Sequence, residues 1–505
     1  MQLTDSKAMR DADEKAIHVL GVPSTLLMTN AAKQLSLAAL ELMGQNKTAV
    51  IFCGSGNNGG DGIGAAVYLL RRGVNIHCIL VGERSKMTED CAEMERRLIE
   101  LGGTLESFEP EDTKLGELLD GAGVIIDALF GIGLNSELRG KALAAVKLIN
   151  KSKTPVVAAD IASGVEADTG CILGDAVHAD VTVTFSMAKI GHFAEPGCVY
   201  CGKLRVADIG LPAEVLKNAG SGVFAVGADD VSLPVRPGVS HKGDYGKLLI
   251  IGGSVGYTGA PVLCAKAAAR SGAGLISLGV PNEIYSITAS RLMEPMPFPL
   301  ADRGNGRISV SALPVIMEKL EQSDVCVLGC GLSRSEEIGE LVRLIIGKSA
   351  KQLVIDADGL FALGSEAQII KSAQKPPVLT PHEGEFIRLG GVLTGDRVDD
   401  ARSFALSREC VLVLKGHRTI IAFPDGEVYI ISAGNPGMAK GGSGDVLAGI
   451  IGAFLGQLSL KKAVITACAV HALAGDICAK RYGEYAMLPS DIIEAIPEIT
   501  KTMTR

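Results

Sequence analysis

Short apolar runs alternate with helix-like patterns along this chain of 505 residues. The alternation is typical of α/β architecture, in which crossover helices join the strands of a parallel sheet. The strands predicted in the first half are residues 48–53, 75–81, 123–128, 155–160 and 181–185. Those predicted in the second half are residues 247–251, 274–280, 324–329, 352–356, 377–380 and 410–415, followed by a hairpin of residues 418–423 and 427–431. The turn of that hairpin is Pro424-Asp425-Gly426.

The region 211–240 interrupts this rhythm. It contains Pro212, Pro234 and Pro237 and the flexible triplet Gly220-Ser221-Gly222. It is therefore predicted to be a domain boundary. The predicted domains are residues 1–218 and residues 225–505, each large enough to bury its own core.

Composition narrows the class of protein. The chain is 47% hydrophobic and 4% aromatic, with a net charge of −8 and no basic block, so no nucleic-acid surface is expected. The N-terminal residues lack an apolar signal core, and the uncharged run 446–460 contains glycines and predicts a buried helix rather than a membrane span. Twelve scattered cysteines, most in apolar strands, are typical of a reducing compartment, so a cytoplasmic protein is expected. Cys198 and Cys201 are expected to lie in a hairpin rather than in a zinc or redox site.

The segment 435–445, Asn-Pro-Gly-Met-Ala-Lys-Gly-Gly-Ser-Gly-Asp, carries the strongest chemical signal. Its glycines allow close approach to a ligand, and the apolar run behind it predicts a helix from about Asp445. A glycine turn at a helix N-terminus favours anions, since free N–H groups and the helix dipole both attract negative charge. A bound phosphate repels a carboxylate, so Asp445 is better suited to take a proton from an attacking hydroxyl. The alternative is that Asp445 only caps the helix.

Residues 53–62, Cys-Gly-Ser-Gly-Asn-Asn-Gly-Gly-Asp-Gly, form a second glycine-rich motif between a predicted strand and the helical pattern 63–72. The glycines Gly54, Gly56 and Gly59 have the G-x-G-x-x-G spacing of dinucleotide sites. Two asparagines and Asp61 are unusual in a plain cofactor loop. They predict polar groups that face a reacting ligand.

Acids end two further strands of the first half. Asp127 and Asp160 each precede a glycine turn, and Ser163 follows Asp160 closely. Because the carboxyl ends of parallel strands face one ligand crevice, these residues and Asn58 are expected to meet there. Their oxygen atoms suit a hard cation as well as acid–base chemistry. The alternative is that the acids cap the helices that follow.

These motifs together resemble a known family. The first half resembles the Rossmann-like YjeF N-terminal family of NAD(P)H-hydrate epimerases, and the second resembles the ADP-dependent NAD(P)H-hydrate dehydratases of the ribokinase-like fold. In this order they resemble the bifunctional NAD(P)H-hydrate repair enzymes. The motifs that carry the resemblance are residues 54–61, 127–137 and 160–164, then 241–246, 329–333, 356–359, 380–385, 415–417 and 435–447.

One segment departs from that family. Its members usually have Leu-Met-Glu-Asn-Ala-Gly near their start, where this chain has Leu27-Met28-Thr29-Asn30-Ala31-Ala32. A carboxylate is therefore missing at Thr29, and Ala32 replaces a glycine. If that acid assists epimerisation or organises a dimer, the first activity is expected to be weak.

For the second half, the resemblance implies dehydration of a nicotinamide cofactor that is hydrated at the ring carbon beside the nitrogen. ADP would donate a phosphoryl group to the substrate hydroxyl, with Asp445 as the catalytic base. The implied substrate-binding residues are Ala260, Gly331, His382 and Asp445, and the implied nucleotide-binding residues are Lys415, Gly416, His417, Arg418, Thr419 and Gly444. Asp356 and Glu385 are candidates for organising Mg²⁺ through water. Lys440 is expected either to neutralise phosphates or to be an ordinary surface lysine.

For the first half, the resemblance implies interconversion of the R and S forms of the hydrate, with Asp160 as the acid/base. The implied substrate-binding residues are Asn57, Asn58, Gly59, Gly60, Asp61, Gly131, Ile132, Gly133, Leu134, Asn135, Ser136, Glu137 and Asp160. The implied K⁺ ligands are Asn58, Asp127 and Ser163. The route of inversion stays open between loss and re-addition of water and ring opening.

Two other functions remain open from the sequence. The second half alone is compatible with a kinase of a small alcohol, which would leave a stable phosphorylated product. The first half alone is compatible with a scaffold module, although the set Asn58, Asp127 and Asp160 favours an active enzyme. The expected partners are small molecules, without nucleic acid or membrane, and a homo-oligomer is expected.

Overall fold

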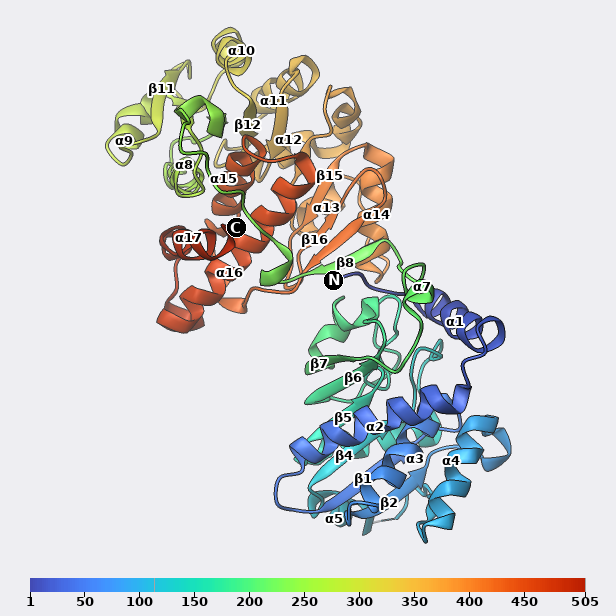
Figure 1. Ribbon diagram of the computed structural model, residues 1–505. Helices are drawn as coiled ribbons and strands as arrows, with labels where there is room; N and C mark the ends of the chain where they lie inside the picture. Colours follow the sequence, from blue (N-terminus) through green and yellow to red (C-terminus); the bar gives the residue numbers. More distant parts are fainter. Residues whose placement is uncertain (113, 505) are drawn as a thin grey trace. The chain divides into compact units, whose positions relative to one another are not determined.

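The computed structural model describes residues 1–112 and 114–504. Thr113 and Arg505 fall within the two predicted domains and lie outside the described residues. The chain divides into two compact units, one formed by residues 2–223 and the other by Met1 with residues 224–505. Each unit is an α/β fold with its own sheet (Figure 1).

A seven-stranded parallel sheet forms the centre of the first unit. Its strands are β1 (Thr48–Cys53), β2 (Asn75–Leu80), β3 (Leu105–Ser107), β4 (Val124–Ala128), β5 (Val156–Ala159), β6 (Val181–Phe185) and β7 (Lys203–Ala207). The strand order is β3-β2-β1-β4-β5-β6-β7, so the order reverses between β1 and β4. Open α/β sheets bind ligands at such a point, outside the carboxyl ends of the strands.

Helices cover both faces of this sheet. They are α1 (Ser6–Glu14), α2 (Ser24–Leu42), α3 (Asn57–Leu70), α4 (Glu89–Glu100), α5 (Lys114–Asp120), α6 (Gly140–Lys151) and α7 (Ala213–Leu216). Alternate residues of β1 belong to two cores: Ile51 packs with residues of α2, α3 and α4, and Phe52 packs with residues of α5 and α6. Burial on both faces explains why β1 is apolar from Ala49 to Cys53.

The second unit has a ten-stranded sheet. Its strands are β8 (Val223–Val226), β9 (Lys247–Ile251), β10 (Leu275–Pro281), β11 (Met296–Leu300), β12 (Val325–Leu328), β13 (Gln352–Ile355), β14 (Val378–Leu379), β15 (Val411–Leu414), β16 (Ile420–Ala422) and β17 (Val428–Ile431). The order is β11-β10-β9-β12-β13-β14-β15-β16-β17-β8. Pairing is parallel from β11 to β15 and antiparallel through β16 and β17. The strand order reverses between β9 and β12.

The helices of the second unit are α8 (Gly259–Arg270), α9 (Tyr285–Ala289), α10 (Leu313–Glu321), α11 (Glu336–Lys348), α12 (Asp358–Leu363), α13 (Glu383–Arg388), α14 (Arg397–Arg408), α15 (Ser443–Leu455), α16 (Leu460–Ala486) and α17 (Pro489–Met503). The main core of this unit joins β9 to α8, α15, α16 and α17. Helix α16 is long and apolar enough to cross a membrane by length and composition, but 61% of its most apolar window is buried inside the unit. It serves here as a core helix.

The strands predicted from apolar runs are all present, with ends that shift by a residue or two. The strands that were not predicted are β3, β7, β8 and β11, and these are the four edge strands of the two sheets. An edge strand is less buried and tolerates proline, as in Met-Pro-Phe-Pro-Leu of β11, so its apolar signal is weak. Strand β8 also lies inside the region 211–240, which is therefore not a plain linker.

Three local expectations need correction. The segment of Cys198 and Cys201 is not a hairpin, because residues 197–199 form a 3₁₀ turn and the Cys201 thiol donates to the Gly197 carbonyl oxygen at 3.4 Å. Helix α3 begins at Asn57, so residues 57–61 lie in its first turns rather than in a preceding loop. Helix α15 begins at Ser443, which places Asp445 in its first turn.

Close backbone packing explains the glycines of the first motif. A Cβ atom at Gly59 would lie 1.8 Å from the Gly54 carbonyl oxygen, and one at Gly54 would lie 2.1 Å from the Leu129 carbonyl oxygen. The start of α3 therefore packs directly on the turns that follow β1 and β4. A Cβ atom at Gly56 would meet nothing within 4 Å.

We expect Gly59→Ala to destabilise the first unit, because a backbone atom cannot move away from the new methyl group as a side chain does. Overpacking costs about 1–3 kcal/mol and sometimes more. Calorimetric unfolding of the full chain measures this as a lower melting temperature. Gly56→Ala is the matched control: it lies in the same motif, but an added Cβ would meet nothing within 4 Å, so this substitution should leave that transition unchanged.

Candidate functional sites

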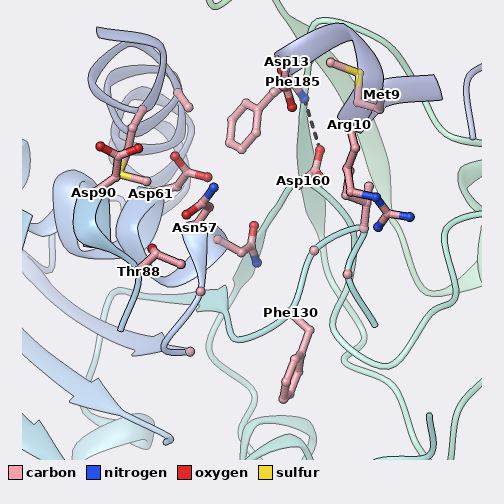
Figure 2. A pocket seen from close by; sticks show the side chains of 18 of the residues that line it. Met9, Arg10, Asp13, Asn57, Asp61, Thr88, Asp90, Phe130, Asp160 and Phe185 are labelled. Carbon is pink, nitrogen blue, oxygen red and sulfur yellow. Dashed lines mark hydrogen bonds between the residues drawn. The ribbon is translucent and has the colours of Figure 1, made fainter. Parts of the chain in front are cut away.

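A cavity of about 550 Å³ lies in the first unit and receives residues from the turns that follow β1, β4 and β5. Of the predicted substrate residues, Asn57, Asn58, Asp61, Gly131, Ile132, Gly133, Leu134 and Asp160 line it. Gly59, Gly60, Asn135, Ser136 and Glu137 are not among its lining residues. Figure 2 shows side chains from α1, α3 and the turn after β5 around this space, including Asp13, Asp61 and Asp160. The prediction that several strand ends form one crevice agrees with this geometry.

Asp160 adopts an unusual conformation at the end of β5. Its φ is +64°, a left-handed value that costs a non-glycine residue of the order of 1–3 kcal/mol. The carboxylate forms an ion pair with the Lys189 ammonium and accepts a hydrogen bond from the Thr184 hydroxyl at 3.1 Å. Burial alone would raise the pKa of Asp160, but the Lys189 ammonium, and to a smaller extent the Phe185 backbone N–H, hold it below its usual value. Asp160 is therefore an ionised base at neutral pH.

Lys189 and His192 complete this centre and were not predicted. Lys189 is 1% exposed, and its ammonium also donates to the Thr184 hydroxyl at 2.9 Å. His192 Nδ1 accepts from the Lys189 backbone N–H at 2.9 Å, so its proton is on Nε2, which donates to the Asp160 carbonyl oxygen at 2.9 Å. Burial lowers the pKa of His192 to about 4, so the ring is neutral. Their position just after the predicted strand 181–185 was the available signal.

Of the predicted cation ligands, Asp127 and Ser163 are in direct contact, and Asn58 faces Gly131 in the turn that follows β4. Asp127 is fully buried and accepts from the Ser163 hydroxyl at 2.6 Å and from the Ser163 N–H at 2.8 Å. Burial raises the pKa of Asp127 to about 6. Both side-chain polar atoms of Asn58 are buried without a hydrogen-bond partner among the residues that the structure describes. A Cβ atom at Gly131 would lie 3.2 Å from Asn58 Oδ1 and 3.3 Å from Asp160 Oδ2, so the amide and the base face the same glycine.

The departure at Thr29 lies away from this centre. The Thr29 hydroxyl donates to the Thr25 carbonyl oxygen at 2.6 Å and accepts from Arg97 at 3.4 Å. Its neighbours Leu27 and Met28 line the cavity, whereas Thr29 is outside the cavity wall that the described residues form. A Cβ atom at Gly64 would lie 2.7 Å from the Cβ of Ala32, so the methyl group at position 32 packs against a glycine of α3.

In the second unit, Asp445 meets Asp356 and Cys330. One carboxylate oxygen of each acid and the Cys330 sulfur all lie within 4.8 Å of one another. Burial, and next the negative charge of Asp356, raise the pKa of Asp445 to about 6, against the opposing effect of a hydrogen bond from Cys330. A carboxyl group with a pKa near neutrality is suited to general-base catalysis.

Lys415 joins the nucleotide-binding residues to this acid pair. Its ammonium lies 2.9 Å from Asp356 Oδ1, which also accepts from the Thr380 hydroxyl at 2.7 Å, and 3.8 Å from Glu385 Oε2. A Cβ atom at Gly444 would lie 3.3 Å from the Lys415 ammonium nitrogen and 3.5 Å from Asp356 Oδ2. The predicted residues Lys415, Gly444, Asp356 and Glu385 are thus brought together with Asp445.

The other predicted nucleotide residues lie between β15 and β16. A Cβ atom at Gly416 would lie 2.5 Å from the Arg397 guanidinium, which was not predicted and which is only 8% exposed. Arg418 donates to the Ser432 carbonyl oxygen, and the Thr419 hydroxyl donates to the Gly416 carbonyl oxygen at 3.4 Å. Burial and the nearby guanidinium groups lower the pKa of His417.

The predicted substrate residues of the second unit lie in two places: Ala260 and Gly331 lie against each other, and His382 lies at the start of α13. A Cβ atom at Gly331 would lie 3.1 Å from the Cβ of Ala260, so these residues face each other beside Cys330. His382 caps α13: its Nδ1 accepts from the Gly384 N–H at 3.0 Å and from the Glu385 N–H at 3.3 Å. The proton of the neutral ring is then on Nε2, and the side chain is 62% exposed. His382 can therefore donate a hydrogen bond to a ligand while it holds the helix start.

Lys440 has a structural partner. Its ammonium donates to the carbonyl oxygens of Tyr485 and Met487 at 2.7 and 2.6 Å. These bonds attach the glycine-rich segment before α15 to the end of α16. Lys440 is therefore not a free surface lysine.

The fold and these two centres define an α/β enzyme with one centre in each unit. The YjeF-related protein N-terminus profile matches residues 24–191, and the NAD(P)H-hydrate dehydratase profile matches residues 248–498. A bifunctional NAD(P)H-hydrate repair enzyme from Moorella thermoacetica is 37% identical over 517 residues, covering 100% of this chain and 97% of the relative. One from Thermofilum pendens is 38% identical over 497 residues, covering 97% of this chain and 94% of the relative.

The chain belongs to the family of bifunctional NAD(P)H-hydrate repair enzymes. A ribokinase-like protein from Enterococcus faecalis is similar in structure, with 29% identity and a TM-score of 0.50, over 56% of this chain and 97% of that protein. The predicted Rossmann-like first half and ribokinase-like second half are confirmed.

We expect Lys189→Met to shift the pH dependence of the first centre. Without the ammonium, burial dominates and the pKa of Asp160 rises, so the base is protonated at pH values where the wild type is active. The acid limb of the pH–rate profile should move to higher pH, whereas Lys189→Arg, which keeps the charge, should move it less. Loss of a buried partner costs about 3–5 kcal/mol, so circular dichroism must show a folded variant. An unchanged acid limb would remove Lys189 from the control of Asp160.

Proposed function

We propose that this chain repairs hydrated NADH and NADPH. Its second unit dehydrates the S form to NAD(P)H at the expense of ADP, giving AMP and phosphate, and its first unit interconverts the R and S forms. The observation that carries the proposal is the group of Gly444, Asp445 and Lys415 at the start of α15, beside the buried Asp356. The proposed extents are residues 1–218 for the epimerase and residues 225–505 for the dehydratase.

Phosphoryl transfer explains how the second unit would remove a poor leaving group. Hydroxide leaves a ring carbon slowly, whereas phosphate leaves readily once the hydroxyl oxygen carries the phosphoryl group. Asp445 would take the hydroxyl proton during the transfer, since burial places its pKa close to neutrality. The backbone N–H groups of residues 441–444 would stabilise charge on the moving phosphoryl group.

The ligand assignments of the second unit stay proposals. Lys415, Gly416, His417, Arg418, Thr419 and Gly444 would bind the nucleotide, and Ala260, Gly331, His382 and Asp445 would bind the hydrate. Asp356 and Glu385 would organise a water-mediated Mg²⁺ site, because both carboxylates lie within 4 Å of the same Lys415 ammonium and so face one space. Bound Mg²⁺ would neutralise charge on the phosphates of the nucleotide.

In the first unit, Asp160 would act as the acid/base of the inversion at the hydrated ring carbon, and the residues of α3 and the turn after β4 would hold the cofactor. Asn58, Asp127 and Ser163 fit a K⁺ site. Asn58 offers a carbonyl oxygen with no other partner among the described residues. The hydrogen-bond partners of the Asp127 carboxylate are neutral donors, Ser163 and the Leu129 N–H. Bound K⁺ would balance that buried charge.

Small molecules are the proposed partners, in a cytoplasmic homo-oligomer without nucleic acid or membrane. The acidic net charge of −8 and the buried cysteines support this assignment. A kinase of a small alcohol is the competing function, and the products separate the two. A kinase leaves a phosphorylated alcohol, whereas the repair enzyme releases free phosphate and restores dihydronicotinamide absorbance.

The decisive experiment mixes both hydrate epimers with the full chain, ADP, Mg²⁺ and K⁺ and follows absorbance. We expect full recovery in the wild type and no ADP-driven recovery in Asp445→Asn, since losing a general base costs on the order of 10²–10⁴-fold. Epimerisation should persist in Asp445→Asn. Asp160→Ala, the matched variant in the other unit, should give a fast phase for one epimer and a slow one for the other. Near-normal dehydration by Asp445→Asn would remove this residue from the mechanism.

Replacing K⁺ by tetramethylammonium should slow epimerisation more than dehydration. The larger cation cannot fit between Asn58, Asp127 and Ser163, whereas the second unit does not use this set. Separate assays of the two half-reactions in both salts measure the effect. Equal epimerase rates in the two salts would argue against a bound potassium ion.

A further inference from the structure

Asp13 places a second carboxyl group in the cavity of the first unit, and the proposed function leaves it without a role. It lies near the end of α1 and lines the cavity with Asp160. In the described part of the chain its carboxyl group has no hydrogen bond or ion pair. Two other acids of this segment are engaged, because Asp5 caps α1 and Asp11 pairs with Lys7 at 2.6 Å.

Helix α1 holds Asp13 firmly in this position. Met9, one turn earlier, is 3% exposed and packs in the main core of the unit. Ala12, which precedes Asp13, packs with Val215 and Ala219. Figure 2 shows the side chains of Met9, Arg10 and Asp13 along the cavity wall with Asp160. The segment is therefore a fixed part of the wall rather than a loose terminus.

The two carboxyl groups have different surroundings. Asp160 is bound to the Lys189 ammonium and to hydrogen-bond donors, which suits an ionised acceptor of protons. Asp13 is half-buried, and the charged groups that act on it are Lys189 and the like charge of Asp160, with Arg10, Asp61 and Asp90 also in the cavity wall. Burial, opposed by Lys189, raises the pKa of Asp13 to about 6. Paired carboxyl groups with separated pKa values are the pattern of an acid and a base.

We propose that Asp13 is the catalytic acid of epimerisation and acts with Asp160 as the base. This inference rests on the proposed function of the first unit. Inversion at the hydrated carbon needs one proton delivered to the departing hydroxyl and one removed from the incoming water. Asp160, held as a carboxylate by Lys189, supplies only the second of these.

Asp13 gives its proton to the hydroxyl oxygen, the C–O bond breaks toward oxygen, and water leaves. The lone pair of the ring nitrogen forms a C=N bond, which leaves the ring cationic. Asp160 then takes a proton from a water that adds to the other face, and the C=N electron pair returns to nitrogen. The reverse inversion uses Asp160 as acid and Asp13 as base.

Asp61 is a weaker candidate for the acid, although it also lines the cavity. It lies in α3 and is 8% exposed, and burial and the charges of Asp160 and Asp13 raise its pKa well above the usual range. A carboxyl group that stays protonated donates hydrogen bonds well but cannot exchange a proton in every turnover. Asp61 therefore suits binding of the cofactor.

The test uses the full chain without ADP, so that the dehydratase reaction does not proceed. One purified hydrate epimer is followed by chromatography in ¹⁸O-labelled water with wild type, Asp13→Asn, Asp13→Glu and the exposed control Asp11→Asn. We expect Asp13→Asn to lose on the order of 10²–10⁴-fold in rate, Asp13→Glu to recover part of it, and Asp11→Asn to match wild type. The inverted product of the wild type should carry solvent oxygen, and the alkaline limb of its pH profile should be missing in Asp13→Asn.

Each other outcome is informative. Near-wild-type inversion by Asp13→Asn, or equal losses in Asp13→Asn and Asp13→Glu with an unchanged pH profile, would overturn the role of Asp13. Inversion that retains the original oxygen would overturn the water-loss step. A calorimetric unfolding transition and a circular dichroism spectrum like those of wild type show that the first unit of each variant is folded, because ADP-driven dehydration reports only on the second unit. If wild type itself does not interconvert the epimers, the proposed function fails, independently of Asp13.

Discussion

Parallel strand pairing is the constraint on which both centres depend. It aligns the carboxyl ends of neighbouring strands at one edge of each sheet, so residues far apart in the sequence face one space. In the first unit this edge unites Asp160, Asn58 and Gly131, which follow three different strands. In the second it unites Asp356 and Lys415 with the start of α15. Disruption of the sheet order would scatter every one of these groups.

The chemistry assigned to each buried acid follows from its nearest charge. Asp160 has a cation against it and is kept ionised. Asp127 has only neutral donors as hydrogen-bond partners, and Asp445 has a second carboxylate beside it. Burial acts on all of them in the same direction, so the neighbour decides which form is present. One residue type can therefore serve as a base, a cation ligand and a proton acceptor for phosphoryl transfer.

Apolar patterns in the sequence were sufficient to predict the strands that are buried on both faces of a sheet. Strands such as β1 and β12 are continuous apolar runs, whereas β3, β7, β8 and β11 lie at sheet edges, where exposure dilutes the signal. The strand-end acids Asp127, Asp160 and Asp356 were found because chain position alone puts them at the ligand edge.

Residues that reach a centre from the side of a helix or from a long loop have no position in the sequence that predicts their role. Lys189 and Arg397 look like surface charges in the sequence, and only tertiary contacts show that they are buried. Asp13 was missed for the same reason, since it lies on an N-terminal helix rather than at a strand end. Nothing in the local pattern distinguishes it from Asp11, which is exposed on the same helix.

The bonds of His192 have a consequence for chemical probing of the first centre. Histidine is the residue most often sought as an acid/base near neutrality, yet both ring nitrogens here are occupied by the backbone of Lys189 and Asp160. The ring is 5% exposed and has no free lone pair to offer. Reagents that acylate histidine should not modify this imidazole. A labelling experiment that relied on such reagents would therefore fail to detect a histidine at this centre. The two hydrogen bonds of the ring hold the left-handed turn at Asp160 in place. His192 therefore contributes to the geometry of the centre rather than to proton transfer.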